Sequence, residues 1–530
     1  MKAMSMTQSY DAIIIGGGHN GLTCGAYLSK AGLKTLVLER RSIVGGAAVT
    51  EEFAPGYRAS TYSFIMGHLH PKVISELELE KFGLESDLVD ETVSFTEDHQ
   101  PIVFSKDRDR TVEQIAKFSK KDAAAYPKFF AYLQNAVALL RRLQMETPPD
   151  LMRRDVKGLI ELAKFGLRYR KVDRKEAYDI LDSLSMSAHD YISQWFETPI
   201  VKAKLMYWAT IGGTVGPYAP GTAFYLVAHL IGQGGMRFAK GGMGTISESI
   251  RASGESNGME VRTDSAVEKI IVKDGRAKAI RLASGEEISA KLIVSNLNAK
   301  LTFGQLVDAK HLPEEIVDRV GRYRTRGKSF KILCAVDSLP QYKGFDSQAT
   351  NVAYPAYAHI GPSPEFLERA FDDAKYGWYS EKPFLTPIVP SYFDPRLAPA
   401  GKHVVSLYGG VANHTLEGAD WDDEIPNLVK NTFGVMDDYA PGFSSTVSDY
   451  KVILPRDIER VLGMPGGNTL HGEMTLDQMF FMRPAPGLHD YRSPIRALYS
   501  CGASSHPGGS VSAVPGHNAA REILKDYKRL

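Results

Sequence analysis

Three glycines near the start of the chain have the type and spacing that dinucleotide binding requires. Gly16, Gly18 and Gly21 directly follow the apolar run YDAIII in the pattern GxGxxG. In a strand–turn–helix unit the first glycine permits a tight turn, the second lets the backbone approach a pyrophosphate, and the third allows close packing of helix on strand. The N–H groups that begin the helix then face the negative charge. The spacing predicts a dinucleotide site, and a glycine-rich turn without a ligand is the alternative.

An acidic residue and a second glycine pair indicate which dinucleotide binds. Glu39 lies about 20 residues beyond the first glycines, where a carboxylate accepts hydrogen bonds from ribose hydroxyls. Gly45 and Gly46 follow, and in flavoproteins such a pair lets the chain run beside the pyrophosphate toward the flavin. NAD enzymes do not need this pair, so we predict FAD, with an ordinary loop as the alternative. The sequence has no second strand–GxGxxG–helix unit that would support a separate NAD(P)H domain.

The C-terminal segment supplies a glycine-rich loop that can pass close to a flat ring. Gly502, Gly508 and Gly509 lie between a strand predicted at 497–501 and a helix predicted at 511–524. The positive end of that helix would stabilise negative charge that develops at the pyrimidine edge of a flavin during reduction. A glycine-rich turn without a ligand is again the alternative.

The elements that must position these residues alternate between strands and helices. Strands predicted at 10–15 and 34–39, with a helix at 20–31 between them, make a βαβ unit. Further on, the pattern predicts a helix at 245–253, a β-meander with strands at 261–263, 267–272, 277–282 and 287–289, and a buried strand at 291–295. We therefore expect a nucleotide-binding domain assembled from residues 1–60, 236–300 and 456–530, and a substrate-binding domain formed by residues 61–235 and 301–455.

The same motifs resemble a known family. A resemblance to the phytoene-desaturase-like flavoproteins, of the carotenoid desaturase or ketolase type, is carried by GGGHNGL, LERRSIVGGAAVTEEFAPGYRAS, KGGMGTISESI, IVSN and LYSCGASSHPGGSVSAVPGHNAA. Within that family, the stretch GNTLHGEMTLDQMFFMRP resembles the branch of pyridine nucleotide-disulphide oxidoreductase domain-containing proteins. The resemblance implies an α/β fold with a Rossmann-like FAD-binding domain of the glutathione-reductase or amine-oxidase type, and an inserted α+β substrate domain. It also implies non-covalent FAD and, often, a long apolar substrate that is desaturated, oxidised or isomerised.

The predicted cofactor site combines residues from all of these motifs. By the resemblance, Glu39, Gly45, Gly46 and Val267 should contact the adenosine and pyrophosphate half, and the chain from Gly502 onward should contact the pyrimidine edge of the flavin. The complete predicted set is Gly16, Gly18, His19, Asn20, Gly21, Glu39, Arg40, Gly45, Gly46, Ala47, Ala48, Gly242, Val267, Asn296, Gly502, Gly508, Gly509, Ser510 and Val511.

Three residues are candidates for catalysis. The flavin itself accepts a hydride, so protein groups need only orient the substrate and take up a proton. His506 lies in the loop expected to face the flavin and is a candidate acid, base or hydrogen-bond donor; a structural imidazole bonded to backbone is the alternative. His471 and Glu473 are candidates for the active site, with a buried structural pair as the alternative.

The remaining segments should bind the substrate. His68 and His70 have a two-residue spacing, but no carboxylate or cysteine cluster completes a metal site, so we predict no metal. An apolar region punctuated by glycine and proline has aromatic side chains that could line a pocket, although most aromatic side chains simply fill cores. These residues are Trp208, Tyr218, Phe224, Tyr225 and His229.

Residues 152–175 combine positive charge with a helical apolar pattern. They include nine basic and three acidic residues, with Val156, Leu159, Ile160 and Leu167 at helical spacing. The segment could lie on an anionic membrane surface. A solvated helix packed by its apolar stripe is the alternative.

Composition narrows the possible classes. A chain of 530 residues is long enough for more than one domain, and a net charge of +1 argues against a chain-wide nucleic-acid surface. The three cysteines lie far apart without a CxxC pair, which argues against a disulfide scaffold or a thiol redox pair. The sequence has neither a signal-peptide pattern nor 18 consecutive apolar residues, so we expect a cytoplasmic protein, with membrane association at most peripheral.

These observations predict an FAD-dependent oxidoreductase that acts as a dehydrogenase, desaturase or oxidase on a hydrophobic small molecule. A hydride would pass to flavin N5, and the electrons would go on to oxygen or a quinone. One alternative is an amine oxidase-like flavoenzyme, which surrounds the amine with aromatic rings. A second is an interaction protein in which FAD is structural and no turnover occurs.

Overall fold

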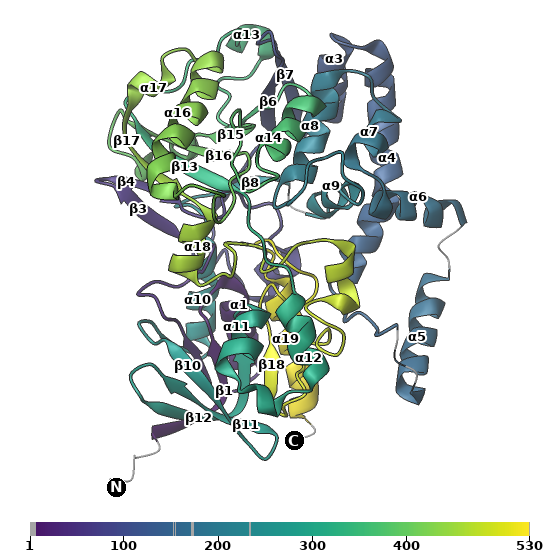
Figure 1. Cartoon of the computed structure of the whole chain (residues 1–530), viewed down its shortest axis with the longest axis vertical. Coiled ribbons are helices and arrows are strands. Elements are labelled where there is room, and N and C mark those ends of the chain that lie inside the picture. Colours follow the sequence, from purple (N-terminus) through teal and green to yellow (C-terminus); the bar gives the residue numbers. More distant parts are fainter. Residues whose placement is uncertain (1–6, 152, 154, 171–173, 233–234, 529–530) are drawn as a thin grey trace.

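The computed structural model describes residues 7–151, 153, 155–170, 174–232 and 235–528. It has two halves, each built on a seven-stranded sheet, which lie one above the other in Figure 1. The strands of the lower sheet all come from the segments expected to bind the nucleotide. The strands of the upper sheet all come from the segments expected to bind the substrate.

The lower sheet is Rossmann-like, as predicted. Its strands run in the order β10 (Val267–Lys273), β11 (Arg276–Leu282), β12 (Glu287–Ser295), β1 (Thr7–Ile15), β2 (Thr35–Leu38) and β9 (Glu260–Arg262), and β18 (Leu498–Ser500) also pairs with β12. β1 is parallel to both β2 and β12. β2 has the direction of β1 because helix α1 (His19–Lys30) returns the chain to the start of the sheet before β2 begins. β10 and β11 are antiparallel to their neighbours, whereas the central strands are parallel and are covered on both faces, as parallel strands usually are.

The covering helices explain why the second half of β1, residues 12–15, is apolar at every position. Ile14 points into a core shared with α1, α10 (Gly244–Ser256) and α19 (Val514–Tyr527). Its neighbour Ile13 points to the other face, where it shares a core with Phe303 and α12 (Glu314–Arg322). Successive side chains of a strand point to opposite faces, so a strand buried on both faces must be apolar at every position.

Two details of the predicted meander are wrong. β9, predicted as its first strand, lies at the opposite edge of the sheet and is parallel to β2. The strands predicted at 287–289 and 291–295 are one continuous strand, β12, whose first half pairs with β11 and whose second half pairs with β18. The local pattern identifies each strand, but consecutive strands are neighbours only as a tendency.

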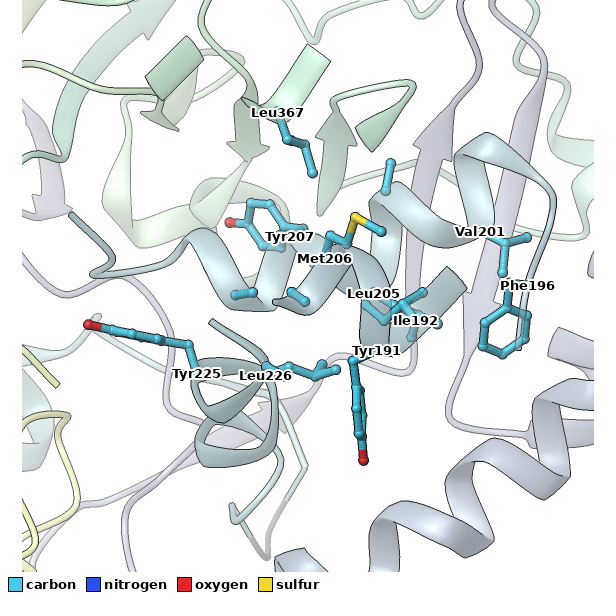
Figure 2. Packing of buried hydrophobic residues seen from close by; sticks show 14 of the residues in the cluster. Tyr191, Ile192, Phe196, Val201, Leu205, Met206, Tyr207, Tyr225, Leu226 and Leu367 are labelled. Atoms are coloured by element: carbon cyan, nitrogen blue, oxygen red, sulfur yellow. The ribbon is translucent and has the colours of Figure 1, made fainter. Parts of the chain in front are cut away.

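The upper sheet is mixed and has helices on both faces. Its order is β17 (Val447–Ile453), β13 (Phe330–Val336), β16 (His403–Gly409), β15 (Leu385–Ile388), β14 (Ala358–Ile360), β6 (Glu91–Phe95) and β7 (Pro101–Ser105). One face packs on α16 (Trp421–Tyr439). The other adjoins a helical core formed by α3 (Arg108–Ala116), α4 (Lys120–Leu143), α7 (Ala188–Ser193), α8 (Pro199–Thr210), α9 (Ala223–His229) and α14 (Pro364–Asp373). Figure 2 shows the centre of this core, where α8 contributes Leu205 and Met206.

The remaining helices are short or peripheral. They are α2 (Pro71–Glu76), α5 (Val156–Tyr169), α6 (Arg174–Ser185), α11 (Ala299–Leu301), α13 (Ser347–Thr350), α15 (Pro390–Phe393), α17 (Phe443–Thr446) and α18 (Pro455–Leu462). In the part of the chain that the structure describes, no helix is long and apolar enough to cross a membrane.

Several contacts join the two halves. The hairpin of β3 (Thr50–Ala54) and β4 (Tyr57–Ser60), from the predicted cofactor segment, contacts β17 and β16 of the upper sheet. β5 (Ser86–Leu88), from the predicted substrate segment, pairs with β8 (Arg237–Ala239), from the predicted cofactor segment. A small core that includes Ala47, Leu333 and Ile458 fills the space between the halves. A site at this junction is therefore supported from both sides.

Candidate functional site

A cavity of about 390 Å³ lies where the two halves meet. Its wall includes residues that directly follow strands of the lower sheet, namely Gly16 after β1, Glu39 after β2 and Asn296 after β12. The upper half contributes Tyr408 of β16 and Trp208 of α8 to the wall. Ligands of open α/β sheets bind outside the carboxyl ends of the strands, so this cavity lies where a nucleotide should bind.

The first glycine turn has the shape that its spacing predicts. Gly16 has a φ of +96°, and its N–H donates to the carbonyl of Leu38 at 2.7 Å. A side chain at Gly21 would overlap the carbonyl oxygen of Gly16, so glycine is needed for α1 to approach the turn. Helix α1 begins with no side-chain cap and no acidic residue in its first turn. Its first N–H groups are therefore available to an anion in the cavity.

Glu39 is held at the same wall by two backbone groups. Its Oε2 accepts a hydrogen bond from the Gly17 N–H at 2.8 Å, and its Oε1 accepts one from the Arg41 N–H at 2.9 Å. The second glycine pair joins this point, because the Gly45 N–H donates to the Gly17 carbonyl at 2.8 Å. The acidic residue and both glycine turns thus meet, which is the arrangement needed to hold the adenosine and pyrophosphate half of FAD.

Unpartnered polar atoms also fit a polar ligand here. Four buried atoms of the wall have no hydrogen-bond partner among the described residues: His19 Nε2, Asn20 Oδ1, Arg41 Nη1 and His471 Nδ1. Buried polar groups are nearly always paired, so these atoms indicate that the cavity takes a ligand with polar groups of its own. Burial lowers the pKa of His19 to about 4 and that of His471 to about 3, so both imidazoles are neutral near pH 7.

Many predicted cofactor residues come together at this cavity. They belong to three distant stretches of the chain, and the cavity brings all three stretches together. Those that line it are Gly16, Gly18, His19, Asn20, Glu39, Gly45, Gly46, Ala47, Asn296, Ser510 and Val511.

Other predicted cofactor residues lie behind the wall rather than in it. They are Gly21, Arg40, Ala48, Gly242, Val267, Gly502 and Gly508, whereas Gly509 lines a smaller cavity that adjoins this one. The Arg40 guanidinium is turned away, toward the carbonyls of Arg460 and Val461 in α18, and it is Arg41 that lines the cavity. The Ala48 carbonyl accepts a hydrogen bond from Ser247 Oγ at 2.8 Å, so this residue attaches α10.

The glycines behind the wall allow close packing of protein on protein. A side chain at Gly502 would overlap the backbone of Asn296, and one at Gly242 would overlap Thr50. Gly508 packs against Met474 and Arg483, and Gly509 packs against Leu470. Val267 packs at the edge of the core on the other face of the lower sheet. A glycine-rich loop therefore does not by itself identify which residue faces a ligand.

The segment that follows β4 also lines the cavity, although no sequence motif predicted it. Tyr62, Ser63 and Phe64 line the cavity and are held there by Lys331 of β13. The Lys331 Nζ donates to the carbonyls of Tyr62 at 2.7 Å, Ser60 at 3.1 Å and Ser63 at 3.4 Å. Burial lowers the pKa of Lys331 to about 7. The sequence signal that could have revealed it is a lysine within the otherwise apolar strand FKILCAV.

A smaller cavity of about 70 Å³ adjoins the first. Four residues line both cavities, His68, His229, Leu470 and Ser510. The rest of the smaller wall is largely apolar and includes Leu140, Leu143, Phe224, Tyr225, Ile231, Met474, Met479 and Phe480. The two cavities form an apolar path from the junction of the halves toward the end of α4.

Most of the predicted pocket aromatics lie along this path. Trp208 and His229 line the large cavity, and Phe224 and Tyr225 line the small one. Tyr218 does not line either, because its ring stacks on His189 with a centroid distance of 4.0 Å.

His68 and His70, the histidine pair for which the sequence predicts no metal, have different contacts. His68 lines both cavities, whereas His70 caps α2 by accepting a hydrogen bond from the Lys72 N–H at 3.2 Å. Within the described ranges, no three His, Cys, Asp or Glu side chains are grouped so that they could hold a metal ion.

The three catalytic candidates occupy different places. His471 lines the large cavity. His506 lines the small one, and its Nε2 lies 2.8 Å from the carbonyl of Leu143, so that nitrogen donates. Glu473 lines neither cavity, is 1% exposed and pairs with Arg324 at 3.1 Å and Arg326 at 2.6 Å. The bond from His506 Nε2 to the Leu143 carbonyl is that of its structural alternative, while His506 Nδ1 has no partner among the described residues. Glu473 pairs with two arginines rather than with His471, and of the three candidates it is His471 that lines the large cavity.

The buried His506 imidazole should make stability depend on pH. Burial lowers its pKa from 6.5 to about 4, so between these values the unfolded chain binds a proton that the folded chain does not. The free energy of unfolding therefore falls as pH drops from 6.5 to 4, by about 1.4 kcal/mol per pH unit for each such proton. In His506→Gln the amide can still donate to the Leu143 carbonyl, but the side chain no longer titrates. The slope of the free energy of unfolding against pH should therefore decrease by about 1.4 kcal/mol per pH unit, the contribution of one proton. Urea unfolding at several pH values measures this slope, and equal slopes for both proteins would contradict the assignment.

Comparisons with known proteins agree with this geometry. A family model described as flavin containing amine oxidoreductase matches residues 21–316. The chain is 34% identical to pyridine nucleotide-disulfide oxidoreductase domain-containing protein 2 of Rattus norvegicus, over 98% of this chain and 94% of that protein. It is 24% identical to a phytoene desaturase (lycopene-forming) of Pseudescherichia vulneris, over 95% of this chain and 96% of that protein. Among solved structures it is similar in fold to cyclohexylamine oxidase from Brevibacterium oxydans, with a TM-score of 0.57, 14% identity, and coverage of 98% of this chain and 100% of that one.

Proposed function

Because the chain belongs to the flavin containing amine oxidoreductase family, we propose that it oxidises a hydrophobic small molecule and passes the electrons to oxygen or a quinone. The chain is an FAD-dependent oxidoreductase of the amine oxidase and desaturase superfamily. The relatives confirm its resemblance to the phytoene-desaturase-like flavoproteins.

Different residues of the cavity would bind different parts of FAD. Glu39 would accept hydrogen bonds from the ribose, and the first N–H groups of α1, together with Arg41, would bind the pyrophosphate. FAD, when bound, supplies the chemistry of hydride acceptance. The chain therefore has to exclude water, place the substrate and handle one proton.

The apolar path is the observation that supports a hydrophobic substrate. Beyond the polar glycine turns, the wall of the large cavity continues with Phe64, Ile65, Trp208, Ile211, Leu230 and Met236. The smaller cavity, which is also largely apolar, lies next to the end of α4. An apolar molecule gains by leaving water for such a wall, whereas a charged one would lose its hydration without a partner. The phytoene desaturase among the relatives is named for a substrate of this class.

His471 is the group best placed to handle the proton. Its Nδ1 is buried, has no partner among the described residues, and belongs to an imidazole whose pKa burial lowers to about 3. A neutral imidazole has a nitrogen lone pair that accepts a hydrogen bond or a proton, although the lowered pKa makes His471 a weak base. The Asn298 side chain donates to the His471 carbonyl at 3.0 Å and so fixes its backbone at the cavity.

Amine oxidation is the second candidate, and one pair of rings favours it. Phe64 and Tyr408 both line the cavity, with ring centroids 4.7 Å apart, and aromatic faces attract cations. Lys331 opposes it, because its Nζ already lies 5.6 Å from the centroid of the Phe64 ring. An amine at the Phe64 ring would lie close to the buried Lys331 amine, which is partly protonated near pH 7 because burial lowers its pKa to about 7, so we prefer the apolar substrate.

Anaerobic reduction of the bound flavin tests the proposal. The protein should purify yellow, and its visible absorption should bleach with a long apolar polyene delivered in detergent, but not with a primary alkylamine. Bleaching by the amine, followed by release of ammonia and hydrogen peroxide in air, would replace the proposal with amine oxidation. Bound FAD that neither class reduces would favour the interaction protein.

A further inference from the structure

Helix α5 has an uncovered apolar face. It stands clear of both halves at the side of the molecule (Figure 1). Val156, Leu159, Ile160 and Leu167 are 74%, 57%, 48% and 61% exposed, and their spacing places them on one face of the helix. None of the apolar side chains that the structure describes on α5 is buried. A contiguous apolar face of this kind marks an interaction site.

The opposite face of α5 is attached to the end of α4 by polar contacts. The Tyr169 hydroxyl donates to Glu146 at 3.3 Å, and Arg168 pairs with the same carboxylate at 2.6 Å. The guanidinium of Arg142 lies 5.3 Å from the centroid of the Tyr169 ring. A helix of 14 residues without apolar packing is marginal in water, so these contacts position α5 but leave its apolar face needing a partner.

Positive charge borders this face and indicates what covers it. Lys164 is exposed and lies beside the apolar residues on the helix, whereas the charge of Arg168 is paired with Glu146. Residues 152–175 include nine basic and three acidic residues, although the whole chain has a net charge of only +1. A bilayer with anionic headgroups offers an apolar layer beneath a negative rim, which matches both features. A second copy of this chain has a net charge of +1, so it offers no net negative charge to the basic border.

The end of α4, which holds α5, also lines the smaller cavity. Leu140 and Leu143, in the last turn of α4, line that cavity, and Arg142 and Glu146 of the same stretch hold α5. A molecule that leaves a membrane at α5 would therefore reach the apolar path that leads to the large cavity.

We propose that α5 docks the protein on an anionic lipid surface, with its apolar face among the acyl chains, and that the substrate enters from this side. The docking does not depend on the proposed function, whereas the entry of substrate rests on it. Only exposed side chains are involved, so variants of this face should fold and keep FAD.

Vesicle sedimentation of the full-length, FAD-loaded protein tests the docking. The protein should bind vesicles of phosphatidylcholine with phosphatidylglycerol and should bind pure phosphatidylcholine vesicles about tenfold more weakly, because the basic border contributes. L159Q/L167Q should bind the anionic vesicles at least about tenfold more weakly, since two leucines no longer gain by burial. V317Q is the matched control, because Val317 is a 38% exposed apolar residue on the helix α12, and it should bind as the wild type does.

Equal binding by L159Q/L167Q, or no vesicle binding by the wild type, would overturn the proposal. The proposal would also be overturned if the wild type were a dimer in solution and L159Q/L167Q were a monomer, because a second copy would then cover the face. Flavin reduction in detergent separates this test from that of the proposed function. It should be unchanged in L159Q/L167Q, and its absence from the wild type would count against the proposed function alone.

Discussion

Gly18→Val should weaken FAD binding by at least about 100-fold, so that the protein purifies nearly colourless. A side chain at Gly18 would begin 2.8 Å from Asn296 Nδ2 and 3.9 Å from Gly45 and Gly46, between the two glycine turns. Valine would fill the space through which the pyrophosphate must pass and would block the first N–H groups of α1. Loss of about 3 kcal/mol of binding free energy corresponds to a factor of about 100.

Flavin absorbance of the purified protein and titration of the apoprotein with FAD measure this effect. Gly32→Ala is the matched control, because Gly32 lies just beyond the other end of α1, has a φ of +88°, and leaves open space of at least 4 Å around the position that an alanine Cβ would take. The control should lose about 1 kcal/mol of stability from its left-handed backbone and none of its FAD affinity. If Gly18→Val retained FAD like the wild type, the cofactor would bind elsewhere.

His471→Asn should slow anaerobic reduction of the flavin by about 100-fold or more while leaving FAD bound. Proton transfer by a positioned side chain contributes about 100-fold to 10,000-fold to the rate. His471 has a φ of +57°, and asparagine is one of the few residues that tolerates this backbone, so the variant should keep the loop intact. The asparagine side chain cannot accept the proton that a neutral imidazole accepts.

Stopped-flow reduction with the substrate identified by the bleaching assay measures the rate, and Glu473→Gln is the control. Glu473 is buried behind the cavity and paired with Arg324 and Arg326, so Glu473→Gln should cost about 1–3 kcal/mol of stability and change the reduction rate only a few-fold. A normal rate in His471→Asn, together with a 100-fold loss in a folded Glu473→Gln, would reverse the two roles.

Most of the cofactor half could be predicted because its signals are local. The run from Tyr10 to Gly32 has the apolar strand, the glycine turn and the helix stop in sequence order, and the structure has β1, α1 and the turn where they were expected. A similar argument holds for β18 and α19, although α19 begins at Val514 rather than at 511. Backbone preferences act over a few residues, so they can be read without knowing the fold.

Residues that reach the cavity through long-range contacts could not be predicted. Arg41 rather than Arg40 lines it, because α18 takes up the neighbouring guanidinium. His506 lines the smaller cavity instead, because its ring bonds to the end of α4. Tyr62 is brought to the wall by Lys331, which is far away in the sequence. Which side of a loop faces a ligand depends on what packs against its other side.

The sequence by itself therefore determined that the chain has a dinucleotide turn, a second glycine pair and a C-terminal glycine loop. Each of them needs glycine, because another residue would either strain the backbone or fill space that a neighbouring segment occupies. Only the tertiary structure decided which of those residues face the cavity, which strand pairs with β2, and that α5 remains uncovered. Those outcomes depend on contacts between residues that are distant in the chain, and no local pattern records such contacts.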